Sequence, residues 1–141
     1  MTATRERSAS RAIGPLHAVL LAGTVPLFLG ALLSDAAYAS TYHVQWSDFA
    51  SWLIVGGLLF AGFALVLAIV DFFRADRRGV GLAYLMVLLA TWMVGFLDAL
   101  MHARDAWASM PTGLVLSAVA ALLACVATWM GFRAPYIGAT P

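Results

Sequence analysis

The stretch ASWLIVGGLLFAGFALVLAIV, residues 50–70, carries no charged side chain. As an α-helix it would extend about 31 Å at ~1.5 Å per residue, which matches the ~30 Å hydrocarbon core of a bilayer. Three further stretches are similar in length and largely apolar: residues 13–33, 80–100 and 112–132. The sequence therefore predicts four transmembrane helices.

The composition supports a membrane protein. Hydrophobic residues make up 63% of the 141 residues and charged residues 11%, against roughly a quarter charged in a soluble domain. A soluble chain of this length could not bury so much apolar surface, so we expect the lipid bilayer to solvate part of it. The net charge is only +1, and no arginine-rich stripe with interleaved aromatics appears. Nucleic acid is therefore not an expected partner.

Arginine is distributed unevenly among the segments that join the four stretches. Arg5, Arg7 and Arg11 precede the first stretch, Arg74, Arg77 and Arg78 lie between the second and third, Arg133 follows the fourth, and only Arg104 lies in another connector. Cytoplasmic connectors of membrane proteins carry an excess of arginine and lysine. We therefore predict an all-α, antiparallel four-helix bundle in the bacterial inner membrane, multi-pass, with both termini cytoplasmic.

This topology divides the chain simply. Residues 13–133 form the four-helix transmembrane domain, between polar cytoplasmic tails at residues 1–12 and 134–141. The Ala-Tyr-Ala run before Ser40 is similar to a signal-peptide cleavage site. The apolar run before it is longer than a signal peptide requires and Asp35 lies close to the cut, so we expect the segment to be retained. Cys125 is the only cysteine, and we expect it to be a packing residue.

Small residues recur every fourth position along the first and fourth stretches and cluster in the second. The rows are Ala18, Ala22, Pro26, Gly30 and Ser34; Gly113, Ser117, Ala121 and Cys125; Ala120, Ala124 and Thr128; and Gly56, Gly57, Ala61 and Gly62. Small side chains let transmembrane helices approach closely, and close packing drives helix association in lipid. These rows predict the contact surfaces of the bundle.

Polar residues gather at the end of the bundle that we expect to face outward. Asp98, His102 and Asp105 share one helical face at positions i, i+4 and i+7. The other outer connector, residues 35–49, adds Asp35 and a second set of polar groups. We predict a binding site for a ligand or partner at this outer mouth. Its candidate residues are Asp35, Asp98, His102, Asp105 and Trp107.

Other interpretations of the same residues stay open. Oxygen and nitrogen ligands at this density could hold a divalent metal ion, for which His43, Asp98 and His102 are weak candidates. Asp98 could instead orient His102 as a proton-exchanging pair. In a purely structural interpretation Asp35, Asp48 and Asp105 cap helix ends and Asp98 pairs with His102 or Arg104.

Cofactor chemistry has little support in the sequence. His17 lies near the inner end of the first stretch and His102 near the outer end of the third, so their depths differ by most of the bilayer core. They cannot ligate one haem iron. We predict no cofactor, and keep haem b or a divalent metal as alternatives. The serines lack a Ser/His/Asp arrangement, so an enzyme is not favoured.

Several of these residues also carry a resemblance to a known family. They are His17, Asp35, Asp71, the run Gly95-Phe96-Leu97-Asp98, and the run HARDAWASMP at residues 102–111. On these residues the chain resembles bacterial domain-of-unknown-function family 2231, over about residues 15–132. The resemblance implies a four-helix inner-membrane protein and supplies no activity.

We therefore predict a non-catalytic, multi-pass membrane module that binds a partner protein or a small ligand at its outer mouth. The partner would be a membrane or periplasmic protein, or a second copy of the chain. The alternative is a redox, metal-binding or haem-binding membrane subunit. A third option is an oligomeric transporter or channel, since four spans alone make a poor pore.

Overall fold

Four long helices and one short helix make up the described chain. The computed structural model describes residues 13–74 and 81–133. The long helices are α1 (Pro15–Thr41), α2 (Val44–Arg74), α3 (Leu82–His102) and α5 (Thr112–Arg133), and α4 (Ala106–Ser109) is a short helix between α3 and α5. These described residues contain no strand. The all-helical prediction is confirmed for them.

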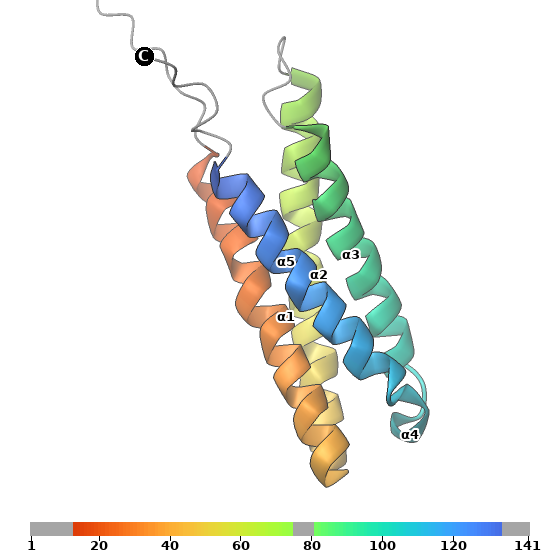
Figure 1. The fold of residues 1–141 in the computed structure, drawn as a ribbon. Helices are drawn as coiled ribbons and strands as arrows, with labels where there is room; N and C mark the ends of the chain where they lie inside the picture. The colour runs from red at the N-terminus through yellow and green to blue at the C-terminus, as the bar shows by residue number, and fades with distance from the viewer. Residues whose placement is uncertain (1–12, 75–80, 134–141) are drawn as a thin grey trace, which may run out of the picture.

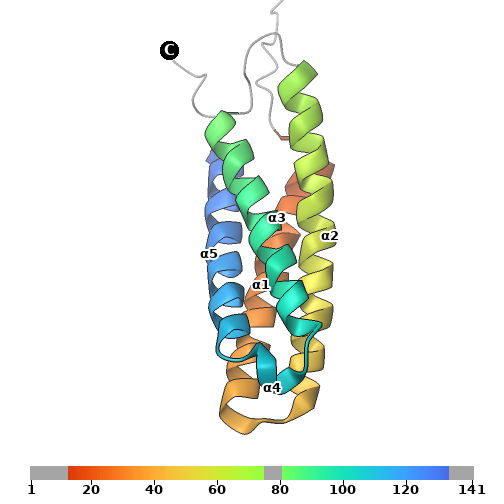
Figure 2. The same ribbon diagram turned by 90° about the vertical axis from the view of Figure 1, so that its right-hand side faces the viewer.

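The long helices form a ring in which each contacts two neighbours. α1 packs against α2 and α5, and α3 packs against α2 and α5, so α1 and α3 lie on one diagonal. In Figure 1 the chain descends through α1, rises through α2, descends through α3 and rises through α5. The α1–α2 turn and α4 therefore lie together at one end, as Figure 2 also shows. We call it the α4 end, and the end with Pro15 and Arg133 the Arg133 end.

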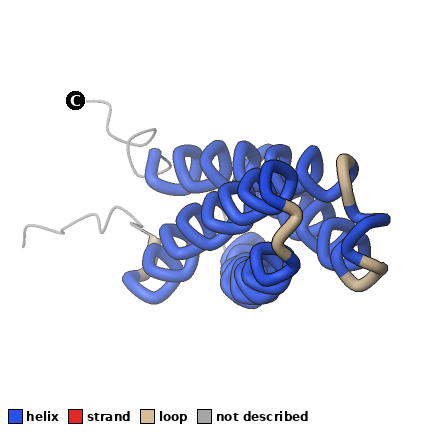
Figure 3. The backbone as a smooth tube through the Cα atoms, turned by 90° about the horizontal axis from the view of Figure 1, so that it is seen from below, coloured by secondary structure: helices blue, strands red, loops and turns tan. Residues whose placement is uncertain are grey.

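By length and composition each of the four long helices could cross a membrane. Their outer faces are apolar, with large exposed side chains such as Phe63, Leu122 and Trp129. Each of the four helices packs against two others, and Figure 3 views their backbones along the bundle from the α4 end. Lipid tails would cover these faces, as the composition requires.

The first two helices are longer than the sequence pattern indicated. The apolar pattern predicts that the first span ends at Leu33, two residues before Asp35. In the structure α1 continues to Thr41 and only Tyr42 and His43 separate it from α2. Two reasons account for the difference: the alanine-rich residues 36–39 favour helix, and Asp35 finds polar partners inside the bundle.

The predicted small-residue surfaces are partly confirmed. On α5 the residues Gly113, Ser117, Ala120, Ala121 and Ala124 are all buried. On α1 the buried face is a different one, built from the larger side chains of Leu21 and Phe28. Cys125 was expected in the packing but is exposed on α5.

Phe28 fills the centre of the bundle. Its ring lies so close to Gly57 of α2 and Gly95 of α3 that a Cβ at either glycine would meet it at 2.9 Å. Alanines from α2 and α5 surround the same ring: Ala61, Ala120, Ala121 and Ala124. The small residues thus make room for one large aromatic side chain, which is a close-packed arrangement without spare volume.

Ala120→Leu should therefore destabilise the bundle by about 1–3 kcal/mol, because Ala120 is fully buried beside Phe28 and added methyl groups have no space. The matched control is Ala118→Leu, the same change at an exposed position of the same helix. Thermal unfolding of the detergent-solubilised protein, followed by circular dichroism, measures both. Equal melting temperatures for the two variants would contradict this packing.

Candidate functional site

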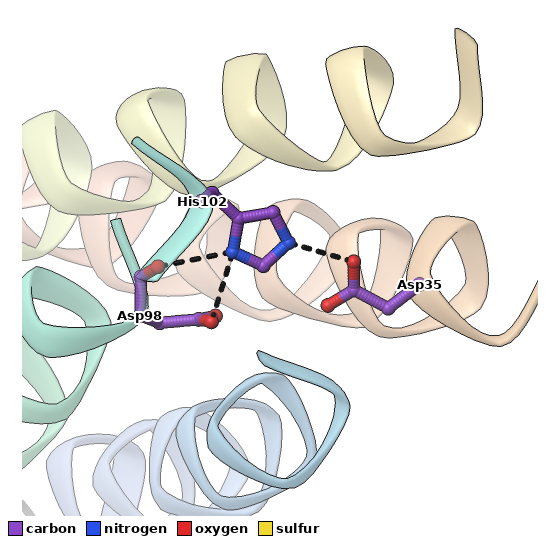
Figure 4. A group of neighbouring side chains, drawn as sticks. All are labelled: Asp35, Asp98 and His102. Carbon is purple, nitrogen blue, oxygen red and sulfur yellow. Dashed lines mark hydrogen bonds and ion pairs between the residues drawn. The ribbon is translucent and has the colours of Figure 1, made fainter. Parts of the chain in front are cut away.

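Four polar side chains from three helices meet inside the α4 end. Asp35 comes from α1, Asp98 and His102 from α3, and Ser117 from α5. Asp35, Asp98 and Ser117 are 0% exposed, and the side chain of His102 is 1% exposed. Figure 4 shows the imidazole of His102 lying between the two carboxyl groups. We call these four residues the acid–imidazole cluster.

His102 links the two diagonal helices. Its Nε2 atom lies 2.8 Å from Oδ1 of Asp35, and its Nδ1 atom lies 3.0 Å from the main-chain oxygen of Asp98, one turn earlier on α3. A carbonyl oxygen only accepts hydrogen bonds, so Nδ1 carries the hydrogen in that contact. The ring is thereby fixed with Nε2 directed at α1.

Ser117 joins the two carboxyl groups from the other side. Its Oγ atom contacts Oδ2 of Asp35 and lies 2.8 Å from Oδ2 of Asp98. A hydroxyl has one hydrogen and can donate it to one carboxylate at a time. The second contact brings two oxygen atoms together without a donor, unless a proton or another cation lies between the groups.

One oxygen of the cluster has no hydrogen-bond donor within the described residues. This atom is Oδ1 of Asp98, which is fully buried. It lies 3.2 Å from Nδ1 of His102, but that N–H is directed at the main-chain oxygen. A buried acceptor without a donor is costly and rare, so the cluster has unused capacity to bind a positively charged group.

Charge leads to the same conclusion. With neutral imidazole, two ionised carboxylates would place two negative charges where water does not reach. Each buried, uncompensated ion costs several kcal/mol even after the protein relaxes. Neither arginine nor lysine contacts Asp35 or Asp98 within the described segments. Compensation must therefore come from a proton or cation held in the cluster.

The cluster also has the residue types of a metal site. Asp35, Asp98 and His102 each offer one ligand atom, and these atoms lie within 4.8 Å of one another. Carboxylate oxygen and imidazole nitrogen together suit divalent first-row transition metals. The spacing between Asp98 and His102, i and i+4 on α3, places both on one helical face.

Sequence reasoning named three of these four residues. Asp35, Asp98 and His102 were predicted site residues, and they come together. The structural interpretation of Asp35 as a helix cap is not what the structure shows, because Asp35 lies six residues before the end of α1 and is buried. Ser117 was noted as a small packing residue and was among the serines for which the sequence indicated no Ser/His/Asp arrangement. Its place opposite two aspartates depends on α5 packing between α1 and α3, which spacing within one helix cannot reveal.

The other predicted site residues lie outside the cluster. Asp105 is exposed and precedes α4 without a side-chain capping bond. Trp107 is 80% exposed, and its ring stacks on Tyr42 with centroids 5.6 Å apart. His43 is exposed in the α1–α2 turn. The Tyr42–Trp107 stack joins α4 to that turn and holds the end of the bundle beside the cluster.

A second polar contact lies at the Arg133 end. Nε2 of His17 on α1 is 2.8 Å from the hydroxyl of Tyr84 on α3. His17 lies 18 residues before Asp35, which is about 27 Å along the helix. His17 and His102 are therefore too far apart to be the two axial ligands of one haem.

Comparison with known proteins gives one match. The profile of a family described as "Predicted membrane protein (DUF2231)" matches residues 14–139. No curated protein and no solved structure is significantly similar to the chain.

Ser117→Ala should lower the free energy of unfolding by about 1–3 kcal/mol, because it removes the one hydroxyl that serves both buried carboxyl groups. Ser40→Ala is the matched control: the Ser40 hydroxyl bonds to a main-chain oxygen of its own helix and is exposed on α1, so its loss should cost less than about 0.5 kcal/mol. Thermal unfolding of each purified variant tests the difference. If Ser117→Ala unfolds like Ser40→Ala, the hydroxyl does not stabilise the cluster.

Proposed function

The chain belongs to the DUF2231 family of predicted membrane proteins, and on that premise we propose that it is a membrane module that binds a divalent transition-metal ion in the acid–imidazole cluster. The ligands would be Asp35, Asp98 and His102, with Ser117 beside them. This proposal joins the small ligand expected at the outer mouth with the divalent metal that the sequence left open as an alternative. The observation that carries it is the buried Oδ1 atom of Asp98, which has no hydrogen-bond donor although it faces an imidazole.

Charge and size favour an ion over a larger ligand. Two carboxylates offset the charge of a divalent cation, and a neutral imidazole adds a ligand without adding charge. Asp35, Asp98 and Ser117 are 0% exposed, so an organic molecule or a protein surface cannot reach them without displacing the helices. An ion needs only the space between the ligand atoms.

The distances are also suitable for a metal ion. Metal bonds of ~2.0–2.2 Å place neighbouring ligand atoms about 3 Å apart when the bonds meet near right angles. The Nε2 atom of His102 and Oδ1 of Asp35 are 2.8 Å apart, close to this value, and the ligand atoms offered by Asp35, Asp98 and His102 all lie within 4.8 Å of one another. The hydrogen bond from Nδ1 to the Asp98 carbonyl is the kind of second contact that orients a ligating imidazole. It leaves Nε2 as the ligand atom.

Manganese, iron, cobalt and zinc are the ions whose preferences fit this mixed ligand set. Carboxylates suit harder ions and imidazole suits borderline ones, whereas no thiolate or thioether in the cluster would select copper(I). The ligand set gives no reason to assign a reaction. We therefore propose that the protein holds the ion and does not transform a substrate.

The full-length protein, purified in detergent and titrated with Co²⁺, should bind about one ion per chain and develop a visible absorption band. Asp98→Asn and His102→Gln should each weaken binding by at least about 100-fold, because loss of a ligand exceeds the 10- to 100-fold cost of losing a ligand's supporting hydrogen bond. Asp105→Asn and His43→Gln serve as matched controls that keep the affinity.

Two results would reject the metal proposal. One is a wild-type protein that binds no Co²⁺, Mn²⁺ or Zn²⁺ above the level of His102→Gln. The other is equal loss of binding in the exposed control variants. Circular dichroism of each variant separates lost ligation from lost folding.

We also infer that both termini face the cytoplasm of a bacterial cell, with the α4 end outside. Arg74 and Arg133 end α2 and α5 at the Arg133 end, whereas Arg104 lies at the α4 end. The other five arginines of this pattern lie outside the described residues. This inference rests on the excess of arginine in cytoplasmic connectors.

In a Cys125→Ser background, Thr41→Cys and Ala108→Cys should both react with a membrane-impermeant maleimide added to intact cells or spheroplasts. Both positions lie at the α4 end, in α1 and α4 respectively. Arg74→Cys, at the other end, is the matched control and should react only after the membrane is opened. Labelling of Arg74→Cys alone would reverse the assignment.

A further inference from the structure

A groove on the outer surface of the bundle lies between α1 and α5. Its volume is about 430 Å³. Val25 of α1 forms one wall, and the other lining residues are Cys125, Thr128, Trp129, Phe132 and Arg133 of α5. Thr128 ties the two helices together here, because its hydroxyl donates to the main-chain oxygen of Leu21 at 3.2 Å. The groove is therefore part of a fixed helix contact.

The groove has an apolar body and a charged end. From Cys125 to Arg133 it follows eight residues of α5, or about 12 Å. Trp129 and Phe132 are 60% and 44% exposed, so the groove opens outward, where lipid surrounds a spanning bundle. Arg133, the last residue of α5, ends the groove.

The guanidinium of Arg133 is held in position. Its central carbon lies 4.2 Å from the centre of the Trp129 ring, a cation–π contact. No carboxylate forms an ion pair with Arg133 in the part of the chain that the structure describes. A planar guanidinium binds phosphate oxygens in pairs. A phosphate at this end of the groove would thus meet a pre-positioned donor.

We propose that this groove binds one anionic glycerophospholipid. The phosphate contacts Arg133, and an acyl chain lies along Val25 and Cys125 toward the middle of the membrane. A lipid fits better than a protein helix for two reasons. The groove is only as wide as the contact between α1 and α5, and it ends at a cation that lies at the depth of the headgroups. Anionic headgroups are the negative charges a bilayer supplies at that depth. This proposal is independent of the metal proposal, since the groove and the cluster lie at different ends of the bundle.

Native mass spectrometry of the full-length protein with equal amounts of phosphatidylglycerol and phosphatidylcholine tests the site. The wild type should retain one phosphatidylglycerol in preference. Arg133→Gln should reduce that preference about fivefold, the effect of one arginine near an anionic surface. Arg74→Gln is the matched control, because Arg74 also ends a helix at the Arg133 end but does not line the groove.

The acyl chain is tested separately. Val25→Trp should fill the groove and reduce retention of both lipids while leaving Arg133 in place. A phosphatidylglycerol with a photoreactive acyl chain should label the peptide that contains Cys125 and Trp129 in the wild-type protein, which needs no variant to fold.

Three outcomes would overturn the proposal. They are equal retention of the two lipids by the wild type, equal loss in Arg133→Gln and Arg74→Gln, and labelling spread evenly over the four helices. Displacement of the lipid by inorganic phosphate alone would also overturn it, because the site would then recognise the free anion without the acyl chain.

Discussion

Two carboxylates without access to water are the constraint on which the arrangement of the helices depends. Asp35 and Asp98 are fully buried on different helices, and each would be prohibitively costly alone. They become tolerable only where His102 and Ser117 bring α1, α3 and α5 together. This polar contact specifies one arrangement of otherwise similar apolar helices. A shift of any of the three helices along its axis would leave a charge unpaired in a medium that cannot solvate it.

The two diagonal contacts support this view of the register. His17 with Tyr84 and Asp35 with His102 are each 67 residues apart in sequence. α1 and α3 run in the same direction, so one constant offset aligns both pairs, about 27 Å apart along the helices. Between them, Thr128 of α5 adds a hydrogen bond to the main-chain oxygen of Leu21 on α1. The diagonal pair is thus aligned by polar contacts near its two ends, and small residues allow the close packing between them.

Much of this fold follows from sequence alone, and part of the site does too. The length of residues 50–70 and the stretches like it indicate four helices, because the bilayer allows few alternatives. Periodicity placed Asp98 and His102 on one face. Asp35 was assigned to the membrane–water interface and lies instead inside the bundle. A lone carboxylate in a sequence suggests the interface, and the partners that compensate for its burial, His102 and Ser117, lie 67 and 82 residues away. Nothing in the sequence marks Ser117 as a member of the acid–imidazole cluster, since serine is also a common small packing residue.

The buried apolar side chains around Phe28 separate the two ends of the bundle. Phe28, Ile54 and Leu88 are fully buried, and the hydroxyls of Thr24 and Thr91 are satisfied by carbonyls of their own helices. Among the described residues, no continuous chain of hydrogen-bonded side chains therefore links the acid–imidazole cluster with His17. For the described residues, this apolar layer separates the polar groups at the α4 end from those at the Arg133 end.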